Sequence, residues 1–304
     1  TMKMLMVYKS LLENTLAIPV IEGQKSEMEK FRGAERTYTL EALMQIGKAV
    51  QAGTSHYLGQ KFAKAFDISF LNREGRREFV HQTSWGVSTR LIGVLIMAHS
   101  DDLGLVLPPK VAPYQAVLIP IFLNDDHKKW IYTEADRLRR ELDKDLRLLV
   151  DLREHLTREE KFREWEAKGV PVRVELGPRD LERQQVILVR RDTGAKHCVN
   201  RFAVKGELQN LLRDIQIDLF RRALRFREEH TILVDRCDHF RRELRDRSGL
   251  FYAHWCGGAA CERRLRHETG ASIRVIPLNN PREKGACLLC GKASEERVYL
   301  AEQL

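Results

Sequence analysis

Four cysteines near the end of the chain occur in two closely spaced pairs. Cys256 and Cys261 form a C-x4-C pair, and Cys287 and Cys290 form a C-x2-C pair. Two such pairs suit a tetrahedral thiolate site, because each tight turn supplies two ligands to one metal ion. Four cysteine ligands leave no open coordination position, so the pattern predicts a structural zinc ion. Glycines that such turns favour stand beside the pairs, at Gly257, Gly258 and Gly291.

Other residues near the two pairs bear on this interpretation. His254 could compete as a ligand, whereas Cys198 and Cys237 have no partner at ligand spacing and are expected to be plain cysteines. Four unrelated buried cysteines are the alternative explanation of the pattern. Because no secretory signal is read in the first twenty residues, metal binding is favoured over disulfides.

A second group that could do chemistry is an arginine at the head of an apolar segment. Arg90 lies in the stretch GVSTRLIGVLIM, directly before the apolar run from Leu91 to Ala98. A guanidinium held there by a helix offers a fixed fork of donors to phosphate oxygens. The alternative is an arginine at the helix edge, whose stem covers apolar surface while its charge stays in water. The residues alone leave both interpretations open.

The composition indicates a globular protein with an anionic partner. The chain has 304 residues, of which 43% are hydrophobic and 31% charged, which suggests two or three domains. Its net charge is +9 and its isoelectric point about 9.3, so nucleic acid is an expected partner and an ordinary basic protein the alternative. No segment reaches the roughly 18 apolar residues of a membrane span. We therefore expect a soluble, cytoplasmic protein that does not contact a membrane.

The first 109 residues combine helix and strand signals. A helix is expected from Met4 to Leu16, and extended segments are expected at residues 36–43, 49–53 and 79–84. The segment from Val87 to His99 predicts a helix that is apolar nearly all round and therefore buried. Pro108 and Pro109 then mark a domain boundary.

Residues 110–203 alternate strand and helix signals, which is typical of a small α/β domain with a mixed sheet. The near-continuous apolar run from Gln115 to Leu123 predicts a parallel strand covered on both faces. A second short strand is expected at residues 147–152, a third at 172–176, and a hairpin at 185–199 around Asp-Thr-Gly. Phe162 and Trp165 lie one helical turn apart, and Gly169 is the expected helix stop. An amphipathic helix from Asp125 to Leu146 is expected to bury Trp130, Ala135, Leu138 and Leu142.

The last hundred residues begin with a long helix and end in the cysteine-rich segment. The apolar stripe of this helix, which starts at residue 204, comprises Leu208, Leu211, Leu212, Ile215, Leu219 and Phe226. The sequence thus predicts three domains, at residues 1–109, 110–203 and 204–304.

Four long segments of the chain resemble prolyl-tRNA synthetase, a class II aminoacyl-tRNA synthetase. They are EGQKSEMEKFRGAERTYTLEALM, QAGTSHYLGQKFAKAFDISF, TSWGVSTRLIGVLIMAHSDDLGLVLPPK and KFREWEAKGVPVRVELGPRDL. The C-terminal cysteines are similar to those of the archaeal and eukaryotic-like type, which carries a zinc-binding domain after its anticodon-binding domain. The resemblance covers essentially the whole chain.

This resemblance implies both a fold and a function. The implied fold is α/β (α+β): the C-terminal part of a class II catalytic domain with an antiparallel sheet, an α/β anticodon-binding domain with a mixed five-stranded sheet, and a small α+β zinc-binding domain. The implied function is proline–tRNA ligase, which uses ATP to convert proline to prolyl-adenylate and transfers it to the 3′ end of tRNA(Pro). The implied cofactors are ATP, Mg²⁺ and structural Zn²⁺, and the full-length enzyme is expected to be a homodimer.

The resemblance also assigns residues to the catalytic site. GVSTRLIG resembles motif 3 of class II synthetases, and Arg90 matches its catalytic arginine, which contacts ATP phosphate. Gln51 and Thr54 match positions near ATP, and His56 and Phe31 match residues lining the proline pocket. Taken singly, Phe31 would be read as core and His56 as an ordinary loop histidine. The strand end beneath the amino acid is matched by Ser84, Trp85 and Gly86.

Four residues of the second block lie in segments that resemble the anticodon-reading face. Basic side chains can bind backbone phosphates, and a bidentate arginine or a glutamate can read splayed base edges. Without the resemblance, these residues would be read as a solvated charged surface. They are Arg153, Lys161, Glu175 and Arg179.

The sequence also departs from the family pattern. Motifs 1 and 2 of the class II catalytic domain are not found, and the chain starts at Thr1, so we expect a fragment that is inactive on its own. The alternative is a truncated, non-catalytic paralogue that acts as a tRNA-binding module. Arg158 and Glu159 stand where the family usually has Pro-Gly, and Leu304 stands where it commonly ends in tyrosine.

Overall fold

The computed structural model describes residues 1–122 and 124–302, so Leu123 and Leu304, which entered the expectations above, lie outside the described residues. The chain divides into two compact units. The first comprises Thr1–Asn14, Ile18–Ala98 and Ala223–Leu304, and the second comprises Thr15–Ala17 and His99–Arg222.

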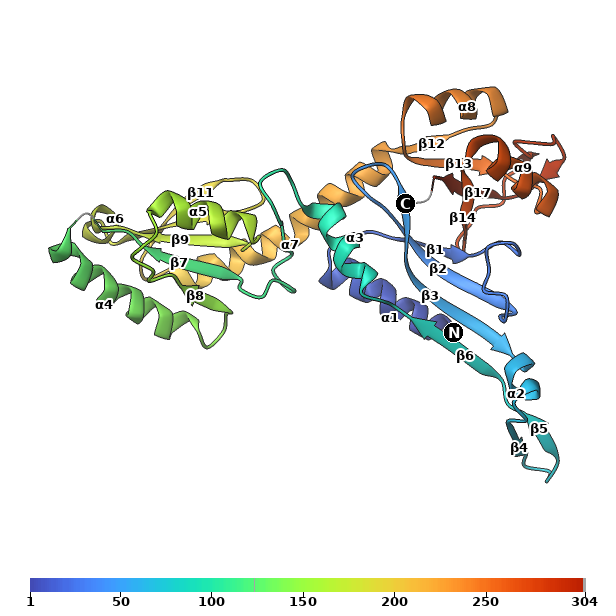
Figure 1. Ribbon diagram of the computed structural model, residues 1–304, viewed down its shortest axis with the longest axis horizontal. Coiled ribbons are helices and arrows are strands. Elements are labelled where there is room, and N and C mark those ends of the chain that lie inside the picture. The colour runs from blue at the N-terminus through green and yellow to red at the C-terminus, as the bar shows by residue number, and fades with distance from the viewer. Residues whose placement is uncertain (123, 303–304) are drawn as a thin grey trace. The chain divides into compact units, whose positions relative to one another are not determined.

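The first unit is built on an eight-stranded sheet (Figure 1) with the strand order β12-β13-β17-β14-β1-β2-β3-β6. All neighbouring strands are antiparallel except β12 and β13. The elements before the second unit are α1 (Met2–Ser10), a π-helical turn (Leu11–Thr15), β1 (Ile21–Gln24), β2 (Arg36–Leu43), β3 (Ala49–Gly59), α2 (Lys61–Ala65), β4 (Ser69–Leu71), β5 (Arg77–Phe79), β6 (Gln82–Gly86) and α3 (Arg90–His99). The elements after it are β12 (Thr231–Leu233), α8 (Cys237–Asp246), β13 (Leu250–His254), α9 (Ala259–Thr269), β14 (Ser272–Pro277), β15 (Gly285–Ala286), β16 (Ala293–Ser294) and β17 (Arg297–Ala301).

Strands β1 and β14 join the two ends of the chain in this sheet. Gly23 pairs with Pro277, and Gln24 pairs with Ile276. Gly23 permits this close approach, because a Cβ atom there would lie 2.2 Å from the Ile276 carbonyl oxygen. Residues expected in the first and third domains therefore share one backbone hydrogen-bond network.

The second unit has a five-stranded mixed sheet with the order β11-β10-β9-β7-β8. Strand β7 is parallel to β8 and β9, whereas β10 is antiparallel to β9 and β11. The elements are β7 (Ala116–Pro120), α4 (Asp125–Leu142), β8 (Leu148–Val150), α5 (Arg158–Ala167), β9 (Val172–Leu176), α6 (Pro178–Glu182), β10 (Gln185–Arg190), β11 (Lys196–Asn200) and α7 (Val204–Glu229), the last of which belongs to this unit up to Arg222.

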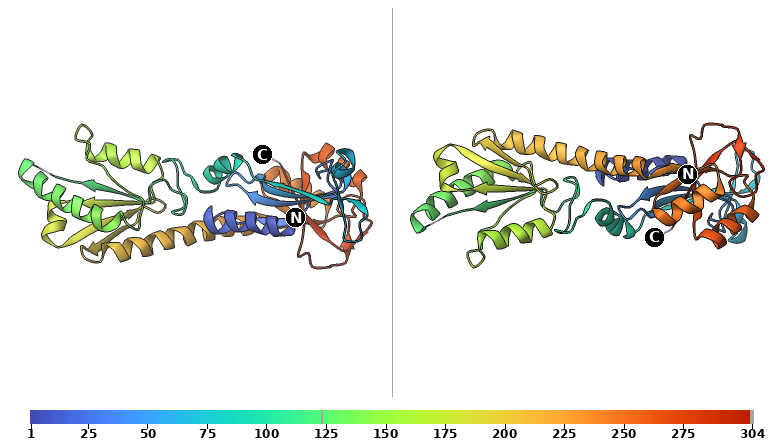
Figure 2. Two further views of the ribbon diagram at one scale, coloured as in Figure 1. Left: turned by 90° about the horizontal axis from the view of Figure 1, so that it is seen from below. Right: turned by 90° about the horizontal axis from the view of Figure 1, so that it is seen from above.

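Helices cover both faces of the five-stranded sheet (Figure 2). Helices α4 and α7 pack on one face, where Leu118, Leu138 and Leu208 belong to the same buried cluster. Helix α5 packs on the other face, where Trp165 contacts the cluster that contains Val117. The expected α/β domain with a mixed sheet is confirmed, because its central parallel strands are buried on both sides.

Several expected elements match the structure closely. Strand β2 spans the expected residues 36–43, and β10 and β11 form the expected hairpin. Gly169 adopts the left-handed conformation, with a φ of 71°, directly after α5 and its cap residue Lys168. These segments follow their local signals, because strand alternation, turn residues and helix stops are encoded over a few residues.

The expected burial of two helices is wrong in part. Helix α3 buries Val94 and His99, but the side chain of Ile92 is 62% exposed and that of Ile96 is 39% exposed. Apolar residues on every side of a helix do not show which side is covered. In the described part of the chain, nothing packs over the face that carries Ile92 and Ile96. In α4, Trp130 is 40% exposed and Ile131 takes its expected place, because the buried stripe runs through positions spaced by three and four residues.

Among the described residues, none of the helices is long and apolar enough to cross a membrane.

The pH dependence of stability is expected to reflect a buried histidine at the end of α3. His99 is 6% exposed, and its Nε2 donates to the Leu16 carbonyl oxygen at 2.9 Å. Burial lowers the pKa of His99 from 6.5 to about 4. The unfolded chain therefore takes up this proton first, and stability present above pH 6.5 is lost as the pH falls towards 4. The loss from this group is about 3 kcal/mol.

His99→Gln keeps an amide donor for the Leu16 carbonyl but cannot titrate in this range. We expect its free energy of unfolding to fall about 3 kcal/mol less than that of the unmutated protein between pH 7 and pH 4. Urea denaturation at each pH measures this difference. Parallel stability curves for the two proteins would contradict the assignment.

Candidate functional site

A cavity of about 350 Å³ lies in the first unit, between β3, β6 and the start of α3. It contains every residue expected to bind ATP or proline except Phe31. The lining residues are Gln51, Ala52, Gly53, Thr54, His56, Ser84, Trp85, Gly86, Val87, Ser88 and Arg90. Gln51, Thr54, Ser84 and Ser88 contribute polar, uncharged side chains, so the cavity offers hydrogen bonds together with the single guanidinium of Arg90.

The register of β3 and β6 explains why these side chains meet. Thr54 pairs with Gly86, and His56 pairs with Ser84. Paired residues share a face of the sheet, and positions two apart along a strand lie on the same face. Both pairs therefore line the same cavity.

A β-bulge brings Gln51 to this face as well. On β2, Leu40 pairs with Gly53, while the next residue, Glu41, pairs with Gln51, so one extra residue of β3 is accommodated at Ala52. Without the bulge, Gln51 would point to the opposite face from Thr54, because side chains alternate along a strand. The bulge thus aims an amide into the cavity.

Thr37 orients the histidine of the cavity. Its Oγ1 lies 2.9 Å from His56 Nδ1, and it accepts a hydrogen bond from the Phe31 backbone N–H at 3.0 Å. The rings of Phe31 and His56 lie 5.2 Å apart, which brings Phe31 to the cavity edge. Burial lowers the pKa of His56. If the Thr37 hydroxyl donates to Nδ1, the neutral ring carries its proton on Nε2 and can donate to a ligand.

Arg90 is an exposed residue at the first position of α3. Its backbone N–H donates to Ser88 Oγ at 3.3 Å. Within residues 1–122 and 124–302, no carboxylate forms an ion pair with its guanidinium. The group is therefore available to an anionic ligand, as a phosphate-binding arginine requires.

A buried charge cluster that the sequence analysis missed lies on the same face of β2. Glu41 is 1% exposed, and its carboxylate accepts from Lys25 Nζ at 2.8 Å and from Arg274 at 2.7 and 3.1 Å. Thr39 Oγ1 also donates to Glu41, at 2.9 Å. The alternation of Thr37, Thr39 and Glu41 in the sequence of β2 could have indicated a polar face of the sheet. Nothing in the sequence around Arg274 indicated that it would bind Glu41.

The expected anticodon residues lie near the carboxyl ends of β8 and β9. Arg153 follows β8, and its guanidinium is held by Asp151 at 2.8 and 2.9 Å and by Glu164 at 2.9 Å. Lys161 is only 6% exposed, and its Nζ donates to the Asp151 carbonyl oxygen at 3.3 Å. The structure therefore brings Arg153 and Lys161 together around Asp151.

Asp151 is the anchor of this group. Burial raises its pKa, but hydrogen bonds from Arg153 and from Trp165 Nε1 outweigh that effect and hold the pKa of Asp151 well below its usual range. Of the other two expected anticodon residues, Glu175 lies within β9 and Arg179 lies after it, on α6. Glu175 accepts from Arg173 Nε at 2.9 Å, whereas Arg179 is exposed on α6 and forms no ion pair within the described residues.

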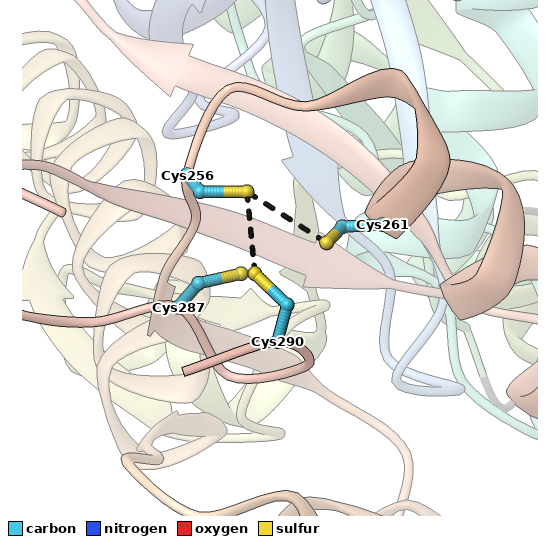
Figure 3. A group of neighbouring side chains, drawn as sticks. All are labelled: Cys256, Cys261, Cys287 and Cys290. Carbon is cyan, nitrogen blue, oxygen red and sulfur yellow. Dashed lines mark hydrogen bonds between the residues drawn. The ribbon is translucent and has the colours of Figure 1, made fainter. Parts of the chain in front are cut away.

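The four paired cysteines meet in space (Figure 3). Cys256 precedes α9, Cys261 lies in its first turn, and Cys287 and Cys290 lie in the turn between β15 and β16. The four Sγ atoms lie within 4.8 Å of one another. His254 does not belong to this group, and neither do Cys198 and Cys237.

The geometry of this four-cysteine cluster fits a tetrahedral metal ion. The Sγ of Cys256 lies 3.7 Å from those of Cys261 and Cys290. Bonds of about 2.3 Å from four thiolates to one ion put neighbouring sulfurs about 3.8 Å apart. Burial raises the pKa of Cys261, whereas hydrogen bonding to the backbone of Lys292 lowers the pKa of Cys290 to about 7.

Comparison with known proteins assigns each part of the chain to a sequence family. Residues 1–99 match the tRNA synthetase class II core domain (G, H, P, S and T), and residues 115–211 match the anticodon binding domain. Residues 237–303 match the family described as prolyl-tRNA synthetase, C-terminal. The chain belongs to the prolyl-tRNA synthetase family. The resemblance stated from the sequence is thereby confirmed.

Individual relatives in the prolyl-tRNA synthetase family align with nearly the whole chain. A "Proline--tRNA ligase" of Natranaerobius thermophilus is 48% identical over 97% of the chain, and one of Porphyromonas gingivalis is 48% identical over 98%. A "Proline--tRNA ligase 2" of Clostridioides difficile is 46% identical over 99%. The chain spans 61–62% of the length of these relatives.

The four-cysteine cluster is expected to bind one metal ion per chain. Cys290→Ser removes a ligand, so it should lower both zinc affinity and thermal stability, because structural zinc contributes to folding. Cys198→Ser is the matched control, since Cys198 is exposed and lies outside the cluster. Zinc titration against a chromophoric chelator, together with thermal unfolding, measures both effects. Equal zinc affinity of the two variants would disprove the cluster as the binding site.

Proposed function

We propose that this chain carries the ATP, proline and tRNA sites of a proline–tRNA ligase. One observation supports this proposal most strongly. The cavity between β3, β6 and the start of α3 gathers all of the expected ATP-binding and proline-binding residues except Phe31, although they come from two separate segments, residues 51–56 and 84–90. A non-catalytic tRNA-binding module is not favoured, because the relatives bear the name of the ligase.

In the first step, a carboxylate oxygen of proline attacks the α-phosphorus of ATP. A new bond forms between that oxygen and phosphorus, the bond to the β-phosphate oxygen breaks, and pyrophosphate leaves. The guanidinium of Arg90, which has no ion pair within the described residues, would bind the negative charge that shifts among the phosphate oxygens during this step. No covalent nucleophile of the protein is required, because positioning and charge stabilisation supply the rate.

Proline has an apolar ring and one amine, so its pocket needs an aromatic wall and a few polar anchors. Phe31 supplies aromatic surface beside His56, whose ring nitrogen is held by Thr37, and Trp85 contributes to the lining of the cavity. Ser84 and Gly86 line the same cavity. In the second step, the terminal ribose hydroxyl of tRNA(Pro) attacks the prolyl carbonyl, and AMP leaves.

The proposal includes zinc as the resident ion of the four-cysteine cluster, because a closed set of four thiolates suits structural zinc. When bound, zinc would cross-link the two turns that carry these ligands. ATP and Mg²⁺ are expected of a class II synthetase, but the cavity lining contains no carboxylate, so no magnesium ligand is assigned. We also expect a homodimer in the cytoplasm, as the family implies.

Substitutions in the cavity are expected to separate ATP from proline. Arg90→Ala should reduce kcat/KM for ATP by about 100-fold or more, the usual cost of removing a preorganised donor from developing charge. His56→Ala should raise KM for proline more than KM for ATP. Proline-dependent pyrophosphate exchange by the intact protein measures both effects.

Arg73→Ala is the control for these variants, because Arg73 is an exposed arginine in the turn between β4 and β5, outside the cavity. It should leave both constants within about twofold, as surface substitutions usually do. Unchanged ATP kinetics in Arg90→Ala would refute the phosphate-binding role.

Arg179 is the cleaner probe of tRNA binding, because Arg153 is already engaged by two carboxylates. Arg179→Ala should weaken binding of tRNA(Pro), and the salt slope should fall by about 1 if the guanidinium contacts a phosphate. If it reads a base, discrimination against other tRNAs should fall instead, by a factor that corresponds to about 1–3 kcal/mol. Filter binding at several salt concentrations distinguishes the two.

Arg140→Ala is the matched control for Arg179→Ala. Arg140 is an exposed arginine near the C-terminal end of α4, where it pairs with Asp136. Its removal should change tRNA affinity little. If both variants lose affinity equally, the expected anticodon face at the ends of β8 and β9 is wrong.

A further inference from the structure

The segment from Lys25 to Phe31 leads from β1 to the aromatic residue at the cavity edge. Three of its polar side chains bind residues from the C-terminal part of the same unit. Lys25 Nζ donates to the Arg274 carbonyl oxygen at 2.8 Å, and Ser26 Oγ donates to Glu262 Oε1. Glu29 pairs with Arg266 at 3.0 Å.

The contact between Ser26 and Glu262 is better protected from water than the Glu29–Arg266 ion pair. Ser26 is 3% exposed and Glu262 is 4% exposed, whereas the side chain of Arg266 is about half exposed. A buried carboxylate that loses its donor pays a larger penalty than a solvated one. The Ser26–Glu262 hydrogen bond therefore restrains the segment more strongly than the outer ion pair does.

A second line of contacts reaches the cavity along β2. Arg274 binds Glu41, and Glu41 accepts from Thr39. Thr37, two residues before Thr39 on the same face, contacts both His56 and the backbone of Phe31. Residues 25–31 are thus held at one end by β14 and α9, and at the other end by Thr37 of β2, which also contacts the histidine.

We propose that Ser26, Glu262 and Arg274 are positioning residues for the amino-acid pocket, which hold segment 25–31 so that Phe31 lies beside His56. The inference rests on the proposed ligase function for its effect on proline. On this view, the C-terminal part of the chain shapes the proline pocket through α9 and β14. Because Glu262 directly follows the cluster residue Cys261, the order of the first turn of α9 matters for the same contact.

The test compares Ser26→Ala with Thr269→Ala. Ser26→Ala removes the donor to Glu262. Thr269 lies on α9 like Glu262, but within the described residues its hydroxyl bonds only to the Leu265 carbonyl oxygen and the Ala271 N–H. Glu262→Gln, which keeps an acceptor oxygen, should have a smaller effect than Ser26→Ala. All variants are first checked for thermal stability.

Hydrogen exchange is the readout that does not depend on activity. Backbone amides of residues 25–35 should exchange about tenfold faster in Ser26→Ala than in Thr269→Ala, the effect of losing one buried hydrogen bond. KM for proline should rise by about tenfold in Ser26→Ala, while KM for ATP stays within about twofold. Unchanged exchange in Ser26→Ala, or an equal rise of both constants, overturns the positioning role.

The two proposals fail in different ways. If the unmutated intact protein shows no proline-dependent exchange of pyrophosphate but segment 25–35 is loosened only in Ser26→Ala, the ligase function falls and the positioning contact stands. If the enzyme is active and segment 25–35 exchanges alike in both variants, the ligase function stands and the positioning role falls.

Discussion

The buried carboxylate of Glu41 is the interaction on which the arrangement of the first unit depends. A carboxylate at 1% exposure is costly unless it is paired and fully hydrogen-bonded. Lys25 and Arg274 supply the opposite charge, and Thr39 supplies a further donor. Burial lowers the pKa of Lys25, and the charge of Glu41 opposes this effect. Removing Glu41 would leave two buried cations without their counterion.

This requirement links segments that are distant in the chain. Arg274 can reach Glu41 only when β14 lies next to β1, as the pairing of Gly23 with Pro277 provides. The same pairing places α9 over segment 25–31, where Glu262 meets Ser26. The C-terminal part therefore contributes strands to the same eight-stranded sheet, and the cluster residue Cys261 directly precedes Glu262, which contacts Ser26.

The second unit also contains a buried carboxylate that must be hydrogen-bonded, that of Asp151. Asp151 is 3% exposed and accepts from Arg153 and from Trp165 Nε1. These contacts fix the segment that follows β8, at the carboxyl edge of the parallel strands, where loops present side chains to ligands. Arg153 consequently has a structural partner, while Arg179 on the neighbouring segment is free of ion pairs within the described residues. The Arg158-Glu159 departure falls in the first turn of α5, where Thr157 and Glu160 form a capping box.

Local features of this protein were determined by the sequence itself. The spacing of Cys256, Cys261, Cys287 and Cys290 predicted a cluster, because ligand pairs on tight turns need few residues between them. Strand alternation in residues 36–43 and the stop at Gly169 were likewise readable, since each depends on backbone preferences over a few positions. The family resemblance added the site residues, which the residue types alone would have left as core or surface.

Other features were decided only by the tertiary structure. The bulge at Ala52 that aims Gln51 into the cavity, the reach of Arg274 to Glu41, and the exposure of Ile92 all depend on which segment lies next to which. Sequence periodicity shows that one face of a helix or strand is polar or apolar, but it does not identify the segment that packs against that face. Pairing between residues more than two hundred positions apart is set by the combined burial and hydrogen bonding of the folded sheet, and no short stretch of sequence contains that information.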